Sequence, residues 1–488
     1  MKLSQILQGI KTAQDYNCEI NISSITQNSQ NVTPNGLFIA LSGKTQDGKK
    51  YIPDAIKRGA AVVVYDGEYD TASQNAVFIK LIGDMRSNIA KIAHNFYPQI
   101  PSMISAITGT NGKTSIADFT RQMMTFLGYH SASIGTIGVV SDVMENIETL
   151  TTPDSITLHQ ILSRLANAGV DYVSMEASSV GIEQYRMDNI KIKTAGFTNL
   201  TQDHLDYHLN MQNYFNAKKL LFSRLLATDG TAVLNADIEQ FPELKSICEQ
   251  RKITVWSYGK NGRELKLLNT IPQPQGQIIT TSIFGKEYII NLPLIGDFQA
   301  MNVLCALGMV CSLNNGFDEK LLEILPKIKG ACGRLDFVGS LPNGASVYVD
   351  YAHTPDALEN VLRTMRHHTQ KNLWVLFGCG GDRDKLKRPI MGEIAAKLAD
   401  KVVITDDNPR SEDAAQIRKE IIAKCPQAIE IGDRIKAIEY AISHLESGDM
   451  LVLAGKGHET GQKIGDTIIP MNDIIEAKRI LSGKDFIF

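Results

Sequence analysis

A short glycine loop at residues 109–115, GTNGKTS, is the first part of the sequence that could do chemistry. An apolar run of strand length at 103–108 precedes it and a helix-compatible segment follows it, which predicts the order strand, glycine loop, helix. In that order the backbone N–H groups of the loop and the N-terminus of the helix converge on a polyphosphate. The members of this predicted phosphate loop are Gly109, Thr110, Asn111, Gly112, Lys113, Thr114 and Ser115.

The charge and the hydroxyl groups of this loop suit a nucleotide such as ATP bound with Mg²⁺. Lys113 would neutralise the β and γ oxygens, and a hydroxyl of Thr114 or Ser115 is placed to coordinate Mg²⁺. The spacing GxxGKT is two residues shorter than the usual GxxxxGK[ST]. The alternative is a glycine turn with a chance lysine, but the strand before it and the helix after it favour the phosphate loop. The loop predicts a nucleotide and leaves the reaction open.

Two further side chains are candidates to share the metal. Glu176 follows the strand-like run 171–175, DYVSM, and His204 follows the run 193–197, KTAGF. Because the carboxyl ends of parallel strands meet at one edge of a sheet, both side chains could reach the phosphate loop as Mg²⁺ ligands. Taken alone, His204 is more simply a surface or hydrogen-bonding histidine, since a single histidine is weak evidence.

Length and composition exclude several classes of protein. A chain of 488 residues exceeds one hydrophobic core and predicts about two to four domains. The net charge of -3, from 50 basic and 53 acidic residues, gives no broad basic field for nucleic acid. No apolar run is long enough for a membrane span, and the N-terminus lacks the apolar core of a signal peptide. We therefore expect a cytoplasmic protein that binds neither nucleic acid nor membrane, with its seven scattered cysteines reduced.

Three α/β segments are expected to position these groups. Strand-like runs at 36–41 and 60–66, with a helical stretch at 51–58, predict a small N-terminal module. The middle third predicts a mostly parallel sheet covered by helices, like that of P-loop ATPases. Its strand-like runs are 103–108, 171–177, 193–200 and 230–235.

The pattern restarts near residue 330. Four buried-type strands there each end in a polar or glycine-rich turn before a helical segment, which predicts a Rossmann-like doubly wound sheet. These strands are 346–352, 372–381, 401–407 and 449–455. The fold class is therefore α/β with three domains, and the predicted boundaries are 1–90, 91–330 and 331–488.

Ten short motifs along the whole chain resemble, in order, those of the Mur ligases. The resemblance is strongest to the member that attaches the third amino acid of the peptide, and folylpolyglutamate synthase is a relative in chemistry. The motifs are TGTNGKTS, MEASSVGIEQYR, TNLTQDHLDYH, NAKKLLF, GDFQAMN, GRLD, DYAHTPDALEN, GCGGDRDKLKRP, DDNPR and GKGHE.

The resemblance implies a reaction. ATP phosphorylates the terminal carboxylate of a UDP-linked muramyl dipeptide, and an incoming amine displaces phosphate to form an amide. Phosphoryl transfer needs positioning and cations rather than a protein nucleophile. The residues implied in catalysis are Lys113, Glu176, His204, Lys218, Arg334 and His353, and Asn302 is implied in contact with adenine.

Lys218 has a special role in the resembling enzymes, which carry the matching lysine as a carbamate. That modification turns a cation into a carboxylate-like metal ligand. By itself, Lys218 beside Lys219 is more simply a solvated helix lysine. The implied metal ligands are thus Thr114, Glu176, His204 and carbamylated Lys218.

The resemblance also implies residues for the UDP-muramyl dipeptide. Thr151, Thr152, Ser178, Gln184 and Arg186 match the muramyl-peptide positions, whereas Val180 stands where relatives often have histidine. On the uridine side the matching residues are Ser29, Lys44, Thr45 and Gln46. Asn28 and Gln30 depart from the usual DSR pattern around Ser29, so a polar surface turn is the alternative there.

The acceptor amino acid is implied to bind the C-terminal domain, where DNPR ends in Arg410. A guanidinium binds a distal carboxylate in bidentate fashion and repels an ammonium, which favours meso-diaminopimelate over L-lysine. Glu459 would take the distal amino group. The set implied for this amino acid is Arg383, Asp407, Asn408, Pro409, Arg410, Gly455 and Glu459.

Several alternatives stay open from the sequence. DNPR could be a plain Asn-Pro turn after a strand, and the chain could be a lysine-adding ligase. A P-loop nucleotide switch or motor is a different class, and the shortened loop and the separate C-terminal sheet argue against it. A non-catalytic homologue is disfavoured because Lys113, Glu176, His204, Lys218 and Arg410 are all present. The resemblance implies a monomer.

Overall fold

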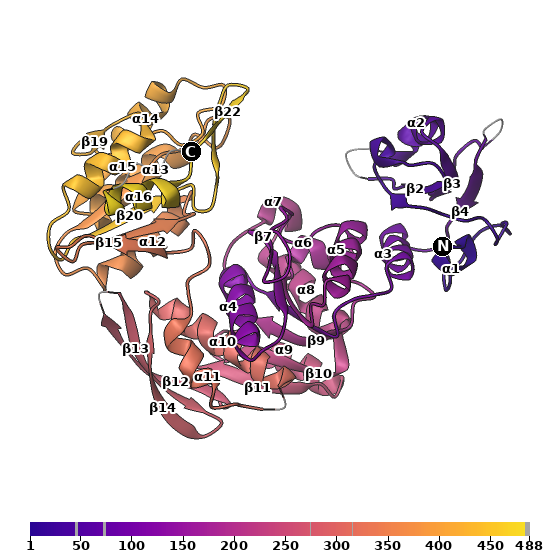
Figure 1. The fold of residues 1–488 in the computed structure, drawn as a ribbon, viewed down its shortest axis with the longest axis horizontal. Helices are drawn as coiled ribbons and strands as arrows, with labels where there is room; N and C mark the ends of the chain where they lie inside the picture. Colours follow the sequence, from indigo (N-terminus) through magenta and orange to yellow (C-terminus); the bar gives the residue numbers. More distant parts are fainter. Residues whose placement is uncertain (44–46, 72–74, 274, 315, 484–488) are drawn as a thin grey trace. The chain divides into compact units, whose positions relative to one another are not determined.

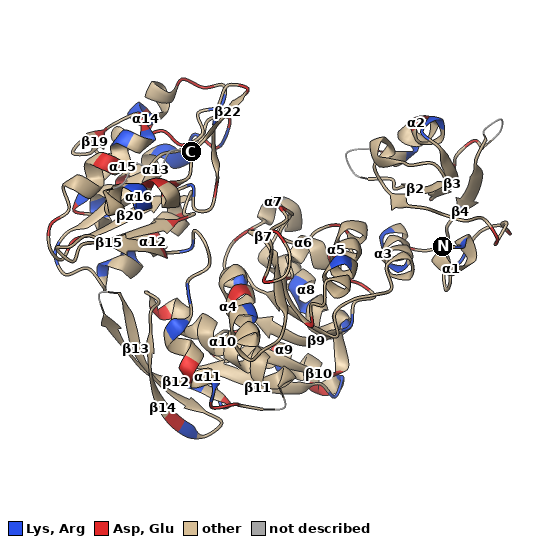
Figure 2. Ribbon diagram, viewed as in Figure 1, with Lys and Arg blue, Asp and Glu red and all other residues tan. Residues whose placement is uncertain are grey.

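The computed structural model describes residues 1–43, 47–71, 75–273, 275–314 and 316–483. The chain forms two compact units (Figure 1). The first unit holds Met1–Tyr258 together with Cys305–Gly316, and the second holds Gly259–Leu304 together with the chain from Phe317 onward. Lys and Arg, like Asp and Glu, are scattered over both units (Figure 2).

The first unit begins with a small parallel sheet in the strand order β1-β2-β3-β4. Its two middle strands are almost wholly buried, so apolar residues fill both faces, as parallel sheets require. The predicted strands at 36–41 and 60–66 and the helix at 51–58 are confirmed. The bounds are β1 Ile25–Thr26, β2 Gly36–Ala40, β3 Ala60–Tyr65, β4 Val77–Lys80, α1 Leu3–Ile6, and α2 Ile52–Lys57.

The larger sheet of this unit runs in the order β11-β10-β9-β5-β8-β6-β7. All neighbours are parallel except β6 and β7, so the predicted mostly parallel sheet is confirmed. The order brings the carboxyl ends of β5, β8 and β9 together at one edge. The bounds are β5 Met103–Thr108, β6 Ser131–Gly135, β7 Gly138–Ser141, β8 Tyr172–Glu176, β9 Ile192–Phe197, β10 Leu226–Asn235 and β11 Thr254–Gly259.

Helices pack on this sheet through their apolar faces. α4 contacts β5, β6 and β8, and α9 contacts β10. α3 packs on α5, which ties the N-terminal module to the larger sheet. The bounds are α3 Met85–Phe96, α4 Lys113–Phe126, α5 Ser155–Asn167, α6 Ser179–Glu183, α7 Leu205–His208, α8 Met211–Leu220 followed by a π-helical turn Leu221–Leu225, and α9 Phe241–Gln250.

The second unit opens with an antiparallel meander that the sequence did not predict. Its strands alternate exposed and buried positions, so each has one face toward solvent. A helix that begins in this unit, α10, and the short α11 follow it. The bounds are β12 Leu265–Gln273, β13 Gly276–Ile283, β14 Lys286–Leu292, α10 Asp297–Leu313 and α11 Leu321–Ile324.

The C-terminal sheet has the order β15-β16-β20-β17-β18-β19, parallel except for β15. One core lies between the sheet and α12, α13 and α14, and another lies between the opposite face and α15 and α16. Alternate strand residues feed the two cores, so the predicted doubly wound sheet is confirmed. The strand bounds are β15 Asp336–Ser340, β16 Ser346–Asp350, β17 Leu373–Phe377, β18 Lys401–Ile404, β19 Ile429–Glu430 and β20 Met450–Ala454.

A two-stranded antiparallel hairpin, β21 Gly461–Ile464 and β22 Thr467–Pro470, follows β20. The helices of this sheet are α12 Pro355–Arg366, α13 Lys387–Leu398, α14 Ala414–Ile422, α15 Arg434–Ser443 and α16 Asp473–Ser482. None of the helices in the described part of the chain combines the length and the apolar character needed to cross a membrane.

Candidate active site

The glycine loop lies between β5 and α4, in the order that the sequence predicts. Gly109 and Gly112 have φ of +145° and +88°, and Gly112 is the cap residue of α4. A Cβ on Gly109 would lie 1.8 Å from the hydroxyl of Thr198, so only glycine fits there. The hydroxyl of Thr198 donates to the carbonyl of Asn111 at 2.7 Å and fixes the far side of the loop.

Two lysines reach the same carbonyl of this loop. Lys113 Nζ donates to the carbonyl oxygens of Gly109 at 2.9 Å and Thr110 at 2.7 Å. Lys218 Nζ, from α8, donates to the carbonyl oxygen of Gly109 at 2.7 Å. The phosphate loop thus has one ammonium from its own helix and a second amine from α8.

Lys218 is only 1% exposed, so the reading of it as a solvated helix lysine is wrong. The helix face that carries it turns toward the loop and not toward water, and its amine also lies 4.3 Å from the ring centre of Tyr214. Burial holds the pKa of Lys218 well below its usual value, and the charge of Lys113 lowers it further, while Asp203 acts in the opposite direction. The surroundings of Lys218 therefore favour the neutral form of its amine.

Glu176 meets Thr114 at the edge where β8 ends. The Thr114 hydroxyl donates to Glu176 Oε1 at 2.9 Å, and the backbone N–H of Thr136 donates to the same oxygen at 2.8 Å. A Cβ on Gly135 would lie 2.1 Å from that oxygen, so the close approach requires glycine. Thr136 was not predicted, because a threonine after a short strand has no distinguishing pattern.

His204 and Lys218 both contact the ring of Tyr214. His204 is the cap residue of α7 with φ of +53°, and its ring is half exposed, with Nε2 3.5 Å from Asp203 Oδ2. Its ring centre lies 6.2 Å from that of Tyr214, the ring that also contacts Lys218. The Tyr214 hydroxyl donates to the Thr110 hydroxyl at 3.4 Å, so these contacts link His204 to the loop through Tyr214.

A divalent cation fits the oxygen donors at this edge. Thr114 and Glu176 offer a hydroxyl and a carboxylate within 2.9 Å of each other, and Mg²⁺ prefers such hard oxygen ligands. Within the described ranges, no group of three or more His, Cys, Asp and Glu side chains is arranged to hold a metal ion.

The five residues predicted for the muramyl peptide come together beside Glu176. The Thr152 hydroxyl donates to the carbonyl of Glu176 at 2.8 Å and accepts from the backbone N–H of Ser178 at 3.0 Å. Arg186 donates to the carbonyl of Thr152 at 2.7 Å and to Gln184 Oε1 at 2.9 Å. The Thr151 hydroxyl lies 3.0 Å from the hydroxyl of Thr136.

Two residues that the sequence did not indicate complete this cluster. Arg86, from α3, donates to Gln184 Oε1 at 3.3 Å, and Gln184 Nε2 donates to the Tyr207 hydroxyl at 3.2 Å. Two guanidinium groups, from Arg86 and Arg186, thus converge on one amide oxygen. An arginine in a surface helix has no local signal that separates it from a solvated one.

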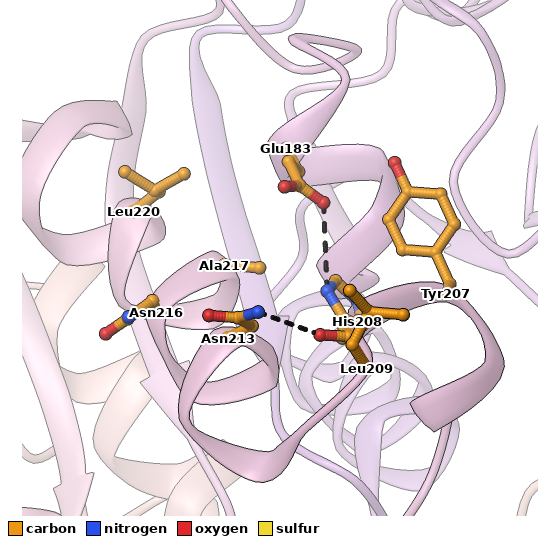
Figure 3. Close-up of a pocket in the computed structure, with 8 residues that line it drawn as sticks. All are labelled: Glu183, Tyr207, His208, Leu209, Asn213, Asn216, Ala217 and Leu220. Atoms are coloured by element: carbon orange, nitrogen blue, oxygen red, sulfur yellow. Dashed lines mark hydrogen bonds and ion pairs between the residues drawn. The ribbon is translucent and has the colours of Figure 1, made fainter. Parts of the chain in front are cut away.

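Beside Tyr207 lies a cavity of about 450 Å³ between α6, α7 and α8 (Figure 3). Glu183 points toward the buried His208, whose Nδ1 lies 3.7 Å from Glu183 Oε2, and Asn213 donates to the carbonyl of His208 at 3.0 Å. The other lining residues are Tyr207, Leu209, Asn216, Ala217 and Leu220.

On the uridine side, Ser29 is buried in a short 3₁₀ turn, Ser29–Asn31, which Asn28 caps. Its hydroxyl is hydrogen-bonded to Asp54 and lowers the pKa of that carboxyl. Lys44, Thr45 and Gln46 lie outside the described residues.

In the second unit, the DNPR segment and the GKGHE segment meet. Asn408 Nδ2 donates to Glu459 Oε2 at 3.0 Å, and Lys456 Nζ donates to Asn408 Oδ1 at 3.2 Å and to Glu459 Oε2 at 3.1 Å. Asp407 follows β18 and Gly455 follows β20, and a Cβ on Gly455 would lie 3.0 Å from Asp407 Oδ2. The predicted residues of the two segments therefore form one cluster, with Lys456 as a member that was not predicted.

Arg410 has an unusual backbone, with φ of +53°. Strand β21 holds it: its N–H donates to the carbonyl of Lys463 at 3.0 Å, and its carbonyl accepts from Gly465 at 2.7 Å. Its guanidinium donates to the carbonyl of Gly381 at 2.7 Å, and a Cβ on Gly381 would lie 1.9 Å from the carbonyl oxygen of Pro409. Arg383, two residues further along the chain from Gly381, is exposed and donates to the carbonyl of Asp382 at 3.3 Å.

The remaining predicted residues also lie in the second unit. The Arg334 guanidinium lies 5.1 Å from the ring centre of Tyr351, and the ring of His353 lies 4.7 Å from the same ring, so Tyr351 joins the two. Asn302 is buried on α10 and donates to Gln299 Oε1 at 3.0 Å.

This arrangement defines a class: α/β proteins that bind a nucleotide on a shortened glycine loop and carry a second, doubly wound sheet with its own polar cluster. The "Mur ligase family, catalytic domain" matches residues 21–97, the "Mur ligase middle domain" matches 107–310 and the "Mur ligase, glutamate ligase domain" matches 333–457.

Proteins named UDP-N-acetylmuramoyl-L-alanyl-D-glutamate--2,6-diaminopimelate ligase are similar over nearly the whole chain. One from Mesorhizobium japonicum is 44% identical over 484 residues, which is 99% of this chain and 100% of that protein. One from Agrobacterium fabrum is 44% identical over 464 residues, 95% of this chain and 94% of that protein. The chain belongs to the Mur ligase family.

Solved structures agree with this assignment. A structure titled with the same ligase name has a TM-score of 0.73 at 29% identity and covers 99% of each chain. Mycobacterium tuberculosis folylpolyglutamate synthase with ADP has a TM-score of 0.61 at 19% identity, covering 76% of this chain and 92% of that one. The second likeness is one of fold.

Proposed function

We propose that this protein is an ATP-dependent ligase that adds meso-diaminopimelate to UDP-N-acetylmuramoyl-L-alanyl-D-glutamate during peptidoglycan precursor synthesis. Relatives that are 44% identical over 95% or more of the chain carry that name, which supports the substrates. The observation in this chain that carries the proposal is that Asn408, two residues before Arg410, donates to Glu459 Oε2 at 3.0 Å, so the DNPR loop meets the loop that carries Glu459.

The phosphate loop holds ATP in this proposal. The N–H groups at the start of α4 and the ammonium of Lys113 face the β and γ oxygens, which concentrates positive charge where negative charge develops. Thr114 and Glu176 hold Mg²⁺, which when bound neutralises charge on the phosphate oxygens. Asn302 contacts adenine.

Lys218 supports the metal as a carbamate. Burial lowers the pKa of its amine and so favours the neutral form, and only a neutral amine has the lone pair that attacks CO₂. The N–C bond forms as one C=O π bond of CO₂ opens, the nitrogen loses one proton, and the product carries a carboxylate-like oxygen pair in place of the amine. His204, linked to Lys218 through Tyr214, completes the ligand set.

The dipeptide carboxylate attacks the γ-phosphorus of ATP, so an O–P bond forms and the bond to the ADP oxygen breaks. The amine of the acceptor then attacks the acyl carbon, a C–N bond forms, the C–O bond to phosphate breaks, and the amine loses a proton. Arg186 and Gln184, with Thr151, Thr152 and Ser178, hold the muramyl peptide, and Ser29 with Lys44, Thr45 and Gln46 holds the uridine end. Arg334 and His353 support the nucleotide from the C-terminal side.

The acceptor binds the C-terminal cluster. Arg410, with Arg383, takes the distal carboxylate of diaminopimelate, and Glu459 takes the distal amino group. Asp407, Asn408, Pro409 and Gly455 shape the loops that hold these charges. Lysine lacks the distal carboxylate and so leaves Arg410 without its partner.

The test is phosphate release by the purified protein with ATP, Mg²⁺ and the UDP-muramyl dipeptide, comparing meso-diaminopimelate with L-lysine. Release with diaminopimelate alone is the expected result. Release with lysine alone would keep the ligase and overturn the acceptor, and ATP turnover that needs no acceptor would favour a nucleotide switch. Size-exclusion chromatography with light scattering tests the expected monomer, and fractionation of cells tests the expected cytoplasmic location.

A further inference from the structure

Lys456 is a buried cation between Asn408 and Glu459. These two residues belong to the C-terminal cluster proposed to bind the acceptor amino acid, which we call the acceptor cluster. The Lys456 side chain is 0% exposed, and its ammonium donates to Asn408 Oδ1 at 3.2 Å and Glu459 Oε2 at 3.1 Å. A lysine is almost never fully buried unless it is paired, because an isolated charge is poorly solvated inside a protein. The pairing with Glu459 compensates the burial of this cation and holds it in place.

The hydrogen bonds give the Asn408 amide one orientation. Its oxygen accepts from Lys456 Nζ and from the backbone N–H of Lys463 at 2.9 Å, so its nitrogen is left to donate to Glu459. The reverse orientation would direct the amide N–H₂ at two donors. The hydrogen bonds from Lys456 and Lys463 thus orient the Asn408 amide with its nitrogen toward Glu459.

Both donors take the same oxygen of the glutamate. Asn408 and Lys456 each donate to Glu459 Oε2, and Oε1 has no hydrogen-bond donor among the described residues. The Glu459 side chain is 33% exposed, so one oxygen is fixed inside while the carboxylate still reaches solvent. A carboxylate held in this way keeps one oxygen for an incoming donor.

We infer that Lys456 is a positioning residue, which fixes the Glu459 carboxylate and the Asn408 amide as one unit. Glu459 thereby presents a single oxygen to the distal amino group of the acceptor. The inference rests on the proposed function, because it takes Glu459 as the group that receives this amino group. Lys456 itself touches no substrate in this scheme. It acts through the carboxylate that it holds.

The test is a double-mutant cycle of Lys456→Met and Glu459→Gln, with KM and kcat measured for each substrate. Met has a similar length and no charge. Lys456→Met should raise the KM for meso-diaminopimelate about tenfold or more, as expected for a charge-assisted contact, while the KM for ATP and for the UDP-muramyl dipeptide stay within about twofold. In the Glu459→Gln background the same change should raise that KM less than about threefold, since the residues act as a unit.

The matched control is Lys436→Met, which removes the same charge from an exposed position on α15 and should leave all three KM values unchanged. Lys456→Gln, which keeps a donor without the charge, repeats the cycle if the Met variant unfolds on thermal melting. Equal effects of Lys456→Met with and without Glu459, or a parallel rise of all three KM values, would overturn the positioning role alone. No diaminopimelate-dependent phosphate release by the wild-type protein would overturn the proposed function and this inference with it.

Discussion

The hydroxyl of Thr114 donates a hydrogen bond to Oε1 of Glu176 across 2.9 Å and so joins the first turn of α4 to the end of β8. The two residues are 62 positions apart in the sequence and meet because β5 and β8 are parallel neighbours. Lys113, one residue before Thr114, directs its ammonium to the carbonyls of Gly109 and Thr110 in the glycine loop.

Lys113→Ala should abolish ligation and leave the fold intact. The ammonium is the cation that the loop offers to the phosphate oxygens, and removing one preorganised donor at developing charge lowers kcat by about 10²-fold or more. Its bonds to the carbonyls of Gly109 and Thr110 are local, so the melting temperature should change little. Phosphate release measures the loss of ligation, and thermal melting checks that the fold is intact. Lys245→Ala, at an exposed position on α9, is the control, and retained turnover in Lys113→Ala would refute the phosphate-loop assignment.

Lys218→Met should abolish ligation and raise stability in CO₂-free buffer. Burial lowers the pKa of this amine in the folded protein but not in the unfolded chain, so between the two pKa values the unfolded state binds more protons. The contribution of Lys218 to the stability of the wild-type protein therefore rises with pH. The stability advantage of the variant should shrink as the pH approaches the pKa of free lysine. Each kcal/mol gained corresponds to roughly 2–4 °C in melting temperature for a domain of moderate size.

Thermal melting at several pH values checks the prediction. Lys219→Met is the matched control, since Lys219 is next on the same helix but pairs with Glu243 near the surface. A variant that melts below the wild-type protein at neutral pH would contradict the burial argument.

These two lysines show how far the sequence could go. The phosphate loop is local: strand, glycines and helix are contiguous, so periodicity and turn residues predict it. The burial of Lys218 depends on which face of α8 packs against Gly109, and neighbouring lysines in a helix do not reveal that. Arg86 and Thr136 join the site through tertiary contacts alone, and their residue types and sequence neighbours do not indicate that they belong to it. The β12–β14 meander was missed because half-exposed strands with many polar residues resemble loops.

Arg410→Ala should weaken the binding of diaminopimelate far more than the binding of ATP. The guanidinium is anchored to Gly381 and to strand β21, so it is preorganised for a carboxylate, and losing a charge-assisted contact weakens binding by about 1.5–3 kcal/mol. Isothermal titration with each ligand measures the two affinities separately. Arg363→Ala, at an exposed position on α12, serves as the control. Equal losses for both ligands would count against a role in acceptor binding.

Arg434 and Asp473 form a buried ion pair beneath the acceptor cluster. Their contacts are bidentate, at 2.7 Å and 2.6 Å, and both side chains are at most 2% exposed. Arg434→Met alone should destabilise the protein by about 3–5 kcal/mol, because it leaves the Asp473 carboxylate buried without its partner. Because Arg434 also donates to the carbonyl of Ala454 at 3.0 Å, the loop after β20 should loosen as well.

The double variant Arg434→Met with Asp473→Leu removes both charges and should recover most of that loss, since an apolar pair of similar volume is often as stable as a buried ion pair. Denaturant unfolding of the three variants gives the coupling. Additive losses would show that the two residues act separately.

His159 should make the first unit less stable in mild acid. It lies on α5, fully buried, with Nδ1 against the carbonyl of Ser155 at 2.8 Å, no partner for Nε2 among the described residues, and the ring of His94 5.9 Å away. Burial lowers the pKa of His159, the Ser155 carbonyl opposes this shift and the neighbouring His94 adds to it, and together they bring the pKa to about 4. Between that value and the ordinary 6.5 the unfolded chain binds a proton that the folded protein refuses, so stability falls as the pH drops through this window.

The full loss at His159 is about 3 kcal/mol, from the depression of its pKa at 1.36 kcal/mol per unit. Denaturant unfolding followed from pH 7 to pH 4 measures it. His159→Phe, which keeps a ring without a titrating group, should flatten this slope, whereas His130→Phe, at an exposed position in the same unit, should not. An unchanged slope in His159→Phe would show that another group controls the acid sensitivity of the α3–α5 contact.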